Sequence, residues 1–231
     1  MIEILKKILP TGVRQALKKS AQRYAFEYAF HCIAAMAPEK IPSRKLLNQL
    51  RTGWGNEGWS GRPAYLEEVV KWAMITPGPI LECGSGLTTL LLGLYAARRG
   101  VPVWTLEDSV DWHERMDAVL SRWHISGVEL CLAPLCDYKS FSWYSPPMAR
   151  MPGQFKLVVC DGPPERTTLG KRYGLLPVMG KRLESGCVIL LDDLNTETTD
   201  NVVDYWTAER SATTKILKAD ESQSFGLIFL G

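Results

Sequence analysis

The sequence predicts a doubly wound α/β sheet. From Ile80 onward, short apolar runs alternate with longer segments of helical periodicity, the pattern of β-α units joined by right-handed crossovers. The runs at 155–161 and 186–193 are continuously apolar, as strands are when helices cover both faces of a sheet. The last two runs, 213–219 and 224–231, lie too close in sequence for a helix between them, so we expect them to pair antiparallel.

The segment before this alternation is expected to be helical. Residues 2–9 have an amphipathic pattern that Pro10 ends, and a longer helix is expected from about Gly12 to Met36. Residues 51–65 are rich in Gly and Trp, and we expect them to form an ordered loop before a helix at 64–74.

The alternating part contains five expected strands and four expected helices before the closing pair. The expected strands are 79–83, 101–107, 128–135, 155–161 and 186–193. The expected helices are 86–100, 111–125, 169–183 and 199–210. Together with the two closing strands they give a seven-stranded sheet.

Charge divides the chain unevenly. Residues 1–50 hold nine Lys and Arg against three Glu, a net charge of +6, which leaves −4 for residues 51–231 because the total is +2. We therefore expect a basic helical extension, residues 1–50, on a main domain, residues 51–231. Such an extension could contact an anionic partner or the surface of a membrane, although a solvated helix face has the same composition.

Three absences point to a cytoplasmic protein. The sequence has no evident signal peptide, and its most apolar early helical run is too short to span a membrane. The six cysteines lack the spacing of metal fingers, and most lie in or beside apolar runs, as expected for buried thiols in a reducing compartment.

An acidic residue closes or follows each of the five expected parallel strands. They are Glu82, Glu107 with Asp108, Asp137, Asp161, and Asp192 with Asp193. The carboxyl ends of parallel strands meet at one edge of the sheet, where doubly wound folds bind their ligands. The sequence therefore predicts a ligand site at this edge.

The turn after the first strand is typical of two classes of ligand. Gly84 and Gly86 allow a tight turn and a close approach by a ligand, and Glu107 follows Gly86 at the distance of an acid that binds ribose hydroxyls. These features suit both a dinucleotide and S-adenosylmethionine. Thr89 stands where the dinucleotide fingerprint has Gly or Ala, and Glu82 would repel a pyrophosphate. The acids therefore favour S-adenosylmethionine, whose ammonium group suits a carboxylate.

Three segments resemble a known family. ILECGSGLTT, VWTLEDSVDW and FKLVVCDGPP resemble motif one, the ribose acid and motif four of class I S-adenosylmethionine-dependent methyltransferases, closest to a small bacterial subgroup with LECGSG and DGPP motifs. The resemblance covers about residues 52–231 and implies a Rossmann-like sheet of order 3-2-1-4-5-7-6. The residues that it implies for cofactor binding are Glu82, Gly84, Ser85, Gly86, Thr88, Glu107, Asp108, Cys136, Asp137 and Asp161.

This resemblance implies methyl transfer to a small molecule, and O-methylation is the expected chemistry. The enzyme would align a nucleophile and remove its proton, with Asp161, Glu165 or Asp192 as the base. Alternatively, Asp161, Asp192 and Asp193 could bind Mg²⁺ or Ca²⁺. That arrangement is similar to the catechol and caffeoyl-coenzyme A O-methyltransferases, but the lysine base of that family has no counterpart here.

Six further residues are expected around the acceptor. They are Trp54, Asn56, Trp59, Tyr144, Arg166 and Arg172. The first three could form a lid, and the arginines could hold a phosphate or carboxylate of the acceptor. Core packing and a solvated basic face are the plain alternatives.

Two other functions stay open at this point. One is an NAD-dependent Rossmann oxidoreductase or epimerase, against which Glu82 and Thr89 argue. The other is a non-catalytic S-adenosylmethionine-binding partner protein. Nucleic acid is a poorer acceptor, because the main domain is acidic and lacks a basic stripe.

Overall fold

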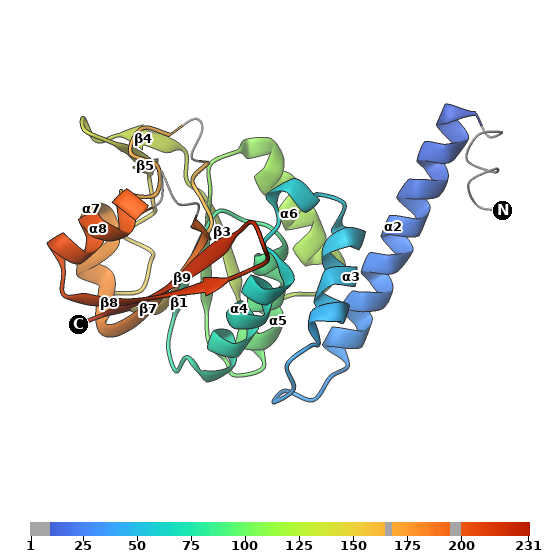
Figure 1. Cartoon of the computed structure of the whole chain (residues 1–231), viewed down its shortest axis with the longest axis horizontal. Coiled ribbons are helices and arrows are strands. Elements are labelled where there is room, and N and C mark those ends of the chain that lie inside the picture. Colours follow the sequence, from blue (N-terminus) through green and yellow to red (C-terminus); the bar gives the residue numbers. More distant parts are fainter. Residues whose placement is uncertain (1–9, 165–167, 195–199) are drawn as a thin grey trace.

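A seven-stranded sheet organises the computed structural model, which describes residues 10–164, 168–194 and 200–231 (Figure 1). Its strand order is β3-β2-β1-β6-β7-β9-β8. All neighbours pair in parallel except β9, which is antiparallel to both β7 and β8. The strands are β1 Ile80–Cys83, β2 Val103–Glu107, β3 Val128–Leu132, β6 Phe155–Cys160, β7 Leu183–Leu194, β8 Ala212–Lys218 and β9 Ser224–Leu230. Numbered within this sheet alone, the order is 3-2-1-4-5-7-6, so the expected order and the antiparallel closing pair are confirmed.

The central strands form the core because both of their faces are buried. All four residues of β1 are buried, and its register joins Leu81 to Val158 of β6. Along β6 the side chains alternate between two apolar cores, with Leu157 and Val159 in one and Val158 and Cys160 in the other. Continuous apolar runs are therefore required here, since an alternating pattern would bury polar groups.

Helices cover both faces of the sheet (Figure 1). On one face of the sheet, the apolar core is completed by side chains of helices α2, α3, α4, α5 and α6. On the other face, it is completed by side chains of α7, α8 and a small hairpin. The helices are α2 Thr11–Ala34, α3 Arg44–Trp54, α4 Pro63–Ile75, α5 Leu87–Ala97, α6 Val110–Arg122, α7 Leu175–Met179 and α8 Asp200–Glu209, with 3₁₀ turns η1 Glu57–Trp59 and η2 Gly180–Arg182. The hairpin consists of β4 Leu135–Asp137 and β5 Ser142–Tyr144.

Helix α3 corrects the expected loop at 51–65, because the first four of these residues are helical. The helix begins at the Ser43 cap, whose hydroxyl accepts from the Leu46 amide at 3.3 Å, and ends at Gly55 with a left-handed φ of 79°. Gly53 lies inside the helix against α2, where a Cβ atom would be 2.3 Å from the Phe26 nitrogen. Close packing of two helices, rather than a loop, accounts for this glycine. Helix α3 also runs through residue 50, the expected boundary between the extension and the main domain.

The remaining expectations for the fold have mixed outcomes. The long early helix is confirmed as α2, and the helix at 64–74 is confirmed as α4. The β4–β5 hairpin was not expected, and the expected helix at 169–183 is reduced to the short helix α7 and the 3₁₀ turn η2 that follows it. The expected helix at 2–9 lies outside the described residues. Among those that are described, none of the helices has the length and apolar character needed to cross a bilayer.

Candidate functional site

A cavity of about 780 Å³ lies at the carboxyl ends of β1, β2, β6 and β7. This is the edge at which the sequence predicts a ligand site. The segment between α3 and α4 supplies one wall, and the ends of the strands supply the others. The residues that line it are Trp54, Asn56, Gly58, Trp59, Ser60, Gly61, Arg62, Gly84, Ser85, Gly86, Glu107, Asp108, Ser109, Trp112, Tyr144, Asp161, Gly162, Pro164, Arg172, Asp192, Asp193 and Gln223.

The glycine turn after β1 packs directly on the turn after β6. Gly84 has a φ of 87°, and a Cβ atom there would lie 3.0 Å from the Gly162 nitrogen. The Gly162 amide in turn donates to the Cys83 carbonyl at 2.7 Å. Gly86 differs, because its φ of 173° suits any residue and a Cβ atom there meets nothing within 4 Å. Neither the backbone conformation nor the packing requires glycine at position 86. The open space beside Gly86 is therefore available to a ligand.

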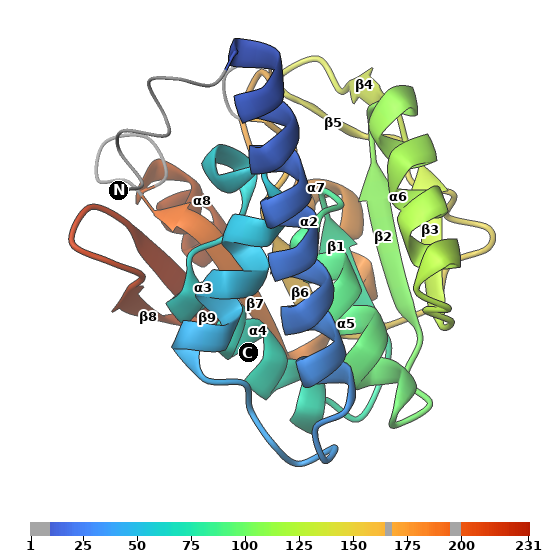
Figure 2. The same ribbon diagram turned by 90° about the vertical axis from the view of Figure 1, so that its right-hand side faces the viewer.

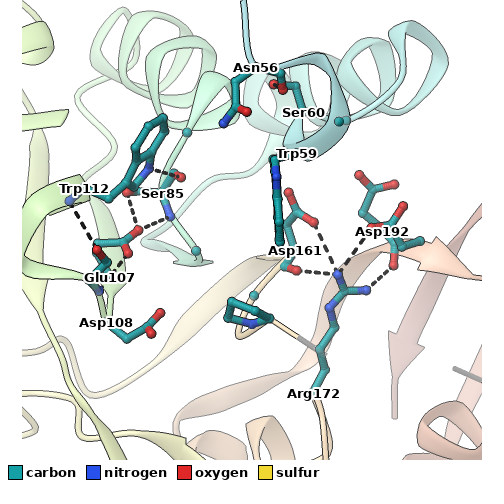
Figure 3. Close-up of a pocket in the computed structure, with 18 of the residues that line it drawn as sticks. Asn56, Trp59, Ser60, Ser85, Glu107, Asp108, Trp112, Asp161, Arg172 and Asp192 are labelled. Carbon is teal, nitrogen blue, oxygen red and sulfur yellow. Dashed lines mark hydrogen bonds and ion pairs between the residues drawn. The ribbon is translucent and has the colours of Figure 1, made fainter. Parts of the chain in front are cut away.

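Glu107, at the end of β2, is held by the glycine turn and by helix α6 (Figure 3). One carboxylate oxygen accepts from the Ser85 amide at 3.1 Å and the Ser85 hydroxyl at 2.5 Å. The other accepts from the Ser109 amide at 3.0 Å. The Trp112 indole donates to the Ser85 carbonyl at 2.9 Å and so braces the same turn. These bonds fix the Glu107 carboxylate at the cavity wall.

Glu82 lies beneath the turn rather than in the cavity. It is fully buried, and one carboxylate oxygen accepts from the hydroxyls of Thr89 at 2.7 Å and Thr105 at 2.8 Å. The Thr89 hydroxyl also accepts from the Gly86 amide at 2.8 Å. Burial raises the pKa of Glu82 to about 7, and hydrogen bonds from neighbouring threonines partly offset this. Glu82 therefore supports the turn from below.

Arg172 joins the ends of β6 and β7 on the opposite side of the cavity (Figure 3). Only 3% of the residue is exposed, and its guanidinium donates to the backbone carbonyls of Asp161 and Asp192. It also lies 3.3 Å from a carboxylate oxygen of Asp161 and 3.7 Å from one of Asp193. The alternative of a solvated basic face is therefore wrong for Arg172, which is buried and binds to three acidic residues.

Asp192 is the buried member of this acidic group. Only 4% of it is exposed, and burial, followed by the charges of Asp161 and Asp193, raises its pKa well above the ordinary value, while Arg172 opposes the rise. A carboxyl group of raised pKa beside a ligand cavity is typical of a general acid or base.

A chain of hydrogen bonds extends from these acids to the rim. The Gln223 amide donates to the Asp193 carboxylate at 3.2 Å, and Arg62 donates to the Gln223 oxygen at 2.6 Å. Arg62 also forms an ion pair with Asp220 at 3.0 Å. The loop before α4 is thus joined to the β8–β9 hairpin and to the end of β7.

The segment between α3 and α4 brings three expected residues to the cavity. Trp54, Asn56 and Trp59 all line it, and Figure 3 draws Asn56 and Trp59 between the Glu107 side and the Arg172 side. Trp59 is 69% exposed. A large apolar side chain so exposed at a cavity mouth is available to a ligand.

Tyr144 presents an unsatisfied polar group at the same place. Its ring is fully buried, and among the described residues its hydroxyl has no hydrogen-bond partner. The hydroxyl lies 3.6 Å from a Cβ atom placed on Gly84 and 2.2 Å from one on Gly162. A buried hydroxyl without a partner is costly, and here it lies at the junction of the two turns.

Other expected site residues lie elsewhere. Thr88 is buried in α5, and Cys136 and Asp137 are exposed on β4; none of the three lines the cavity. Asp108 does line it, and burial, with the neighbouring Glu107 charge, raises its pKa. Glu165 and Arg166 lie outside the described residues.

Sequence reasoning missed several residues of the site. Ser109, Trp112, Arg62 and Gln223 all line the cavity. Ser109 had a signal, because it caps α6 by accepting from the Trp112 amide at 3.3 Å directly after an expected strand. Gln223 had none, since it reaches the site only through the antiparallel pairing of β9.

A metal site does not fit the part of the chain that the structure describes. Within residues 10–164, 168–194 and 200–231, no group of three or more His, Cys, Asp or Glu side chains is placed to hold a metal ion. Arg172 already supplies the positive charge among Asp161, Asp192 and Asp193. The expected Mg²⁺ or Ca²⁺ ligation by these three residues therefore has no support.

Comparison with known proteins identifies the fold. No protein-family model matches the sequence, and no curated protein matches it either. Among solved structures, a methyltransferase from Podospora anserina with SAH bound has a TM-score of 0.61 at 16% identity, over 97% of this chain and 98% of that one. An O-methyltransferase from Bacillus cereus in complex with SAH has a TM-score of 0.57 at 14% identity, over 84% and 94%.

A third structure agrees with these two. Precorrin-6y C5,15-methyltransferase from Geobacter metallireducens has a TM-score of 0.55 at 10% identity, over 76% of this chain and 95% of that one. Sequence identities this low establish a common fold and nothing finer. The chain therefore has the fold of the S-adenosylmethionine-dependent methyltransferases.

Proposed function

We propose that this protein is an S-adenosylmethionine-dependent methyltransferase that transfers a methyl group to a hydroxyl oxygen of a small molecule. The observation that carries the proposal is the cavity itself. Its volume of about 780 Å³ is typical of small-molecule sites, and it joins a glycine turn with its acid, Glu107, to a buried acidic group around Asp192.

The Glu107 side of the cavity suits the methyl donor. Gly86 leaves open space beside the turn, and Glu107 would hold the ribose hydroxyls. Asp108 and Glu107 make this wall anionic, which favours a ligand without phosphate over a dinucleotide. S-adenosylmethionine supplies a methyl group that its sulfonium centre already activates.

The Arg172 side suits the acceptor. Asp192 is the candidate base, because its raised pKa favours proton uptake and it lines the cavity. Arg172 fixes the backbone at Asp192 and at Asp161, so the base is held by the strand ends rather than by a flexible loop. Trp59 and Asn56, at the mouth, would cover an acceptor and exclude water.

A calorimetric titration tests the donor. The purified chain is titrated with S-adenosylhomocysteine and, separately, with NAD. We expect the first to bind and the second to give no heat of binding. Binding of NAD without binding of S-adenosylhomocysteine would overturn the proposal in favour of an oxidoreductase.

A label-transfer assay tests catalysis. S-adenosylmethionine labelled in its methyl group is incubated with a panel of phenols, alcohols and carboxylic acids. We expect Asp192→Asn to lower turnover on the accepted compounds by about a hundredfold or more while cofactor affinity stays unchanged. The exposed Asp204→Asn in α8 is the matched control and should keep full turnover. Cofactor binding without transfer to any compound would favour a non-catalytic binding protein.

A further inference from the structure

Helix α2 stands at the margin of the molecule (Figures 1 and 2). Its second half packs against the main domain through Phe26, Ala29, Phe30 and Ile33, all of them buried. Its first half makes no comparable contact, since every residue from Thr11 to Ala21 is exposed. Figure 2, which views this side of the molecule, draws α2 in front of the other helices.

An apolar stripe runs along the exposed side of α2. Val13, Leu17, Tyr24 and Tyr28 are 44%, 55%, 71% and 52% exposed, and we call these four residues the outer stripe. Their spacing of four, seven and four residues places them on one helical face. Tyr24 and Tyr28 stack with ring centroids 6.4 Å apart.

The outer stripe faces away from the main domain. At 100° per residue, Tyr24 and the buried Phe26 point in nearly opposite directions, as do Tyr28 and Phe30. A flat partner could therefore contact the whole stripe without touching the sheet or its other helices.

Positive charge flanks the outer stripe. Arg14 and Lys18 lie to one side of it and Arg23 to the other, whereas Lys19 lies nearer the opposite face, and residues 10–26 contain no acidic residue. The first acid of the helix, Glu27, already accepts from Arg23 at 2.8 Å and also from Arg122. The exposed face of α2 therefore has an apolar and aromatic centre with basic residues on both sides.

We propose that the outer stripe and its flanking basic residues bind the surface of a membrane that contains anionic lipid, with α2 lying in the interface. Apolar and aromatic side chains along one face with Lys and Arg beside them are the composition of interfacial helices. Basic residues near an anionic bilayer are attracted electrostatically, and tyrosine suits the boundary between headgroups and acyl chains. The inference is independent of the methyltransferase proposal.

Other partners suit this surface less well. A second copy pairing through the outer stripe would bring two cationic surfaces together, with no acid in residues 10–26 to match them. Nucleic acid would contact a basic stripe, whereas the centre of this face is Leu17, Tyr24 and Tyr28.

Vesicle flotation with the full-length protein tests the proposal. Vesicles of phosphatidylcholine alone are compared with vesicles of phosphatidylcholine mixed with phosphatidylglycerol. We expect binding to the mixed vesicles only, and weaker binding at high salt. The variants Leu17→Asn/Tyr24→Asn and Arg14→Glu/Lys18→Glu should each reduce bound protein by roughly tenfold or more. Helical circular dichroism and thermal unfolding are recorded to show that both variants fold.

A matched control distinguishes an effect of the basic residues on α2 from an effect of the protein's net charge. Lys215→Glu/Lys218→Glu changes the net charge by the same amount on the exposed strand β8 and should bind vesicles as the wild type does. Equal loss in this control, binding to neutral vesicles alone, or no binding at all would overturn the proposal. So would a concentration-dependent dimer in light scattering that Leu17→Asn/Tyr24→Asn abolishes, or preferential binding to a DNA or RNA duplex.

Discussion

The Ser85 hydroxyl donates a 2.5 Å hydrogen bond to the Glu107 carboxylate and so joins the turn after β1 to the end of β2. The Ser85 amide reaches the same oxygen at 3.1 Å. Two donors from one residue therefore orient a carboxylate that lines the cavity through contacts within the protein itself. Such preorganisation lowers the cost of ordering the site on binding.

The first prediction concerns the affinity for the methyl donor. Glu107→Ala removes a charged acceptor at the cavity wall, and we expect binding of S-adenosylhomocysteine to weaken by about 1.5–3 kcal/mol. Calorimetry measures the change. The matched control is Glu114→Ala, an exposed acid on α6 that does not line the cavity, and its affinity should equal that of the wild type. Unchanged affinity in Glu107→Ala would mean that other residues hold the ribose.

A second prediction compares two buried tyrosines. The Tyr65 hydroxyl donates to the Leu190 carbonyl at 3.4 Å, whereas the Tyr144 hydroxyl has no partner among the described residues. Tyr65→Phe should therefore lower the free energy of unfolding by about 1 kcal/mol, while Tyr144→Phe should leave it unchanged or raise it slightly. Urea unfolding of the free protein measures both values.

The same pair should behave differently when ligand is present. If a bound cofactor supplies the partner that Tyr144 lacks, Tyr144→Phe weakens binding of S-adenosylhomocysteine by roughly fivefold, the value of a single neutral hydrogen bond. Tyr65→Phe should leave this affinity unaltered, because Tyr65 does not line the cavity. A destabilised Tyr144→Phe variant would contradict the argument, since it would reveal an existing partner.

A third prediction addresses the clamp at Arg172. Arg172→Met leaves the carbonyls of Asp161 and Asp192 without their donor and removes the cation beside the acidic group, so we expect a loss of about 3 kcal/mol or more in the free energy of unfolding. Arg172→Lys keeps the positive charge but lacks the planar guanidinium, so its free energy of unfolding should lie between those of the wild type and Arg172→Met. The control Arg150→Met removes an exposed pair with Glu129 and should change little. Equal effects at the two sites would refute a clamp.

The fourth prediction is a pH dependence that arises from Glu82. Its pKa rises from an ordinary 4.5 to about 7 on folding, so the folded protein holds a proton that the unfolded chain has lost between these values. The stabilising contribution is complete below pH 4.5 and is lost as the pH rises through about 7, by roughly 3 kcal/mol in total. Glu82→Gln should remove this dependence. Urea unfolding at pH 5 and pH 8 gives the difference between the two proteins, and parallel pH profiles would contradict the assignment.

The sheet was predictable because its signals are local. Continuous apolar runs such as 155–161 identify strands buried on both faces, and the short gap before 224–231 predicts the antiparallel pair. Helix α3 was missed because Gly53 and Gly55 resemble loop residues in the sequence. Gly53 is glycine because the backbone of Phe26 in another helix leaves no space for a Cβ atom, a contact that no local pattern records.

The sequence predicted where the candidate site lies, but not which of its side chains are buried and which face the cavity. Acids at the strand ends mark the correct edge, and Glu107, Asp108, Asp161 and Asp192 all line the cavity. The sequence could not show that Glu82 lies under the turn, because its partner Thr105 comes 23 residues later on a neighbouring strand. For the same reason the burial of Arg172 could not be predicted, since the two carbonyls to which it donates come from the end of β7 and from the turn after β6.

The contact between Gly84 and Gly162 has an implication for how this protein can change. A side chain at either glycine would collide with the other turn or with the Tyr144 hydroxyl. The turn after β1 and the turn after β6 therefore cannot change separately, because a side chain added to either one collides with the other or with Tyr144. Under the proposed function, a change of acceptor is therefore expected from the segment between α3 and α4 and from the β8–β9 hairpin, where Trp59 and Gln223 line the cavity away from the pair of glycines.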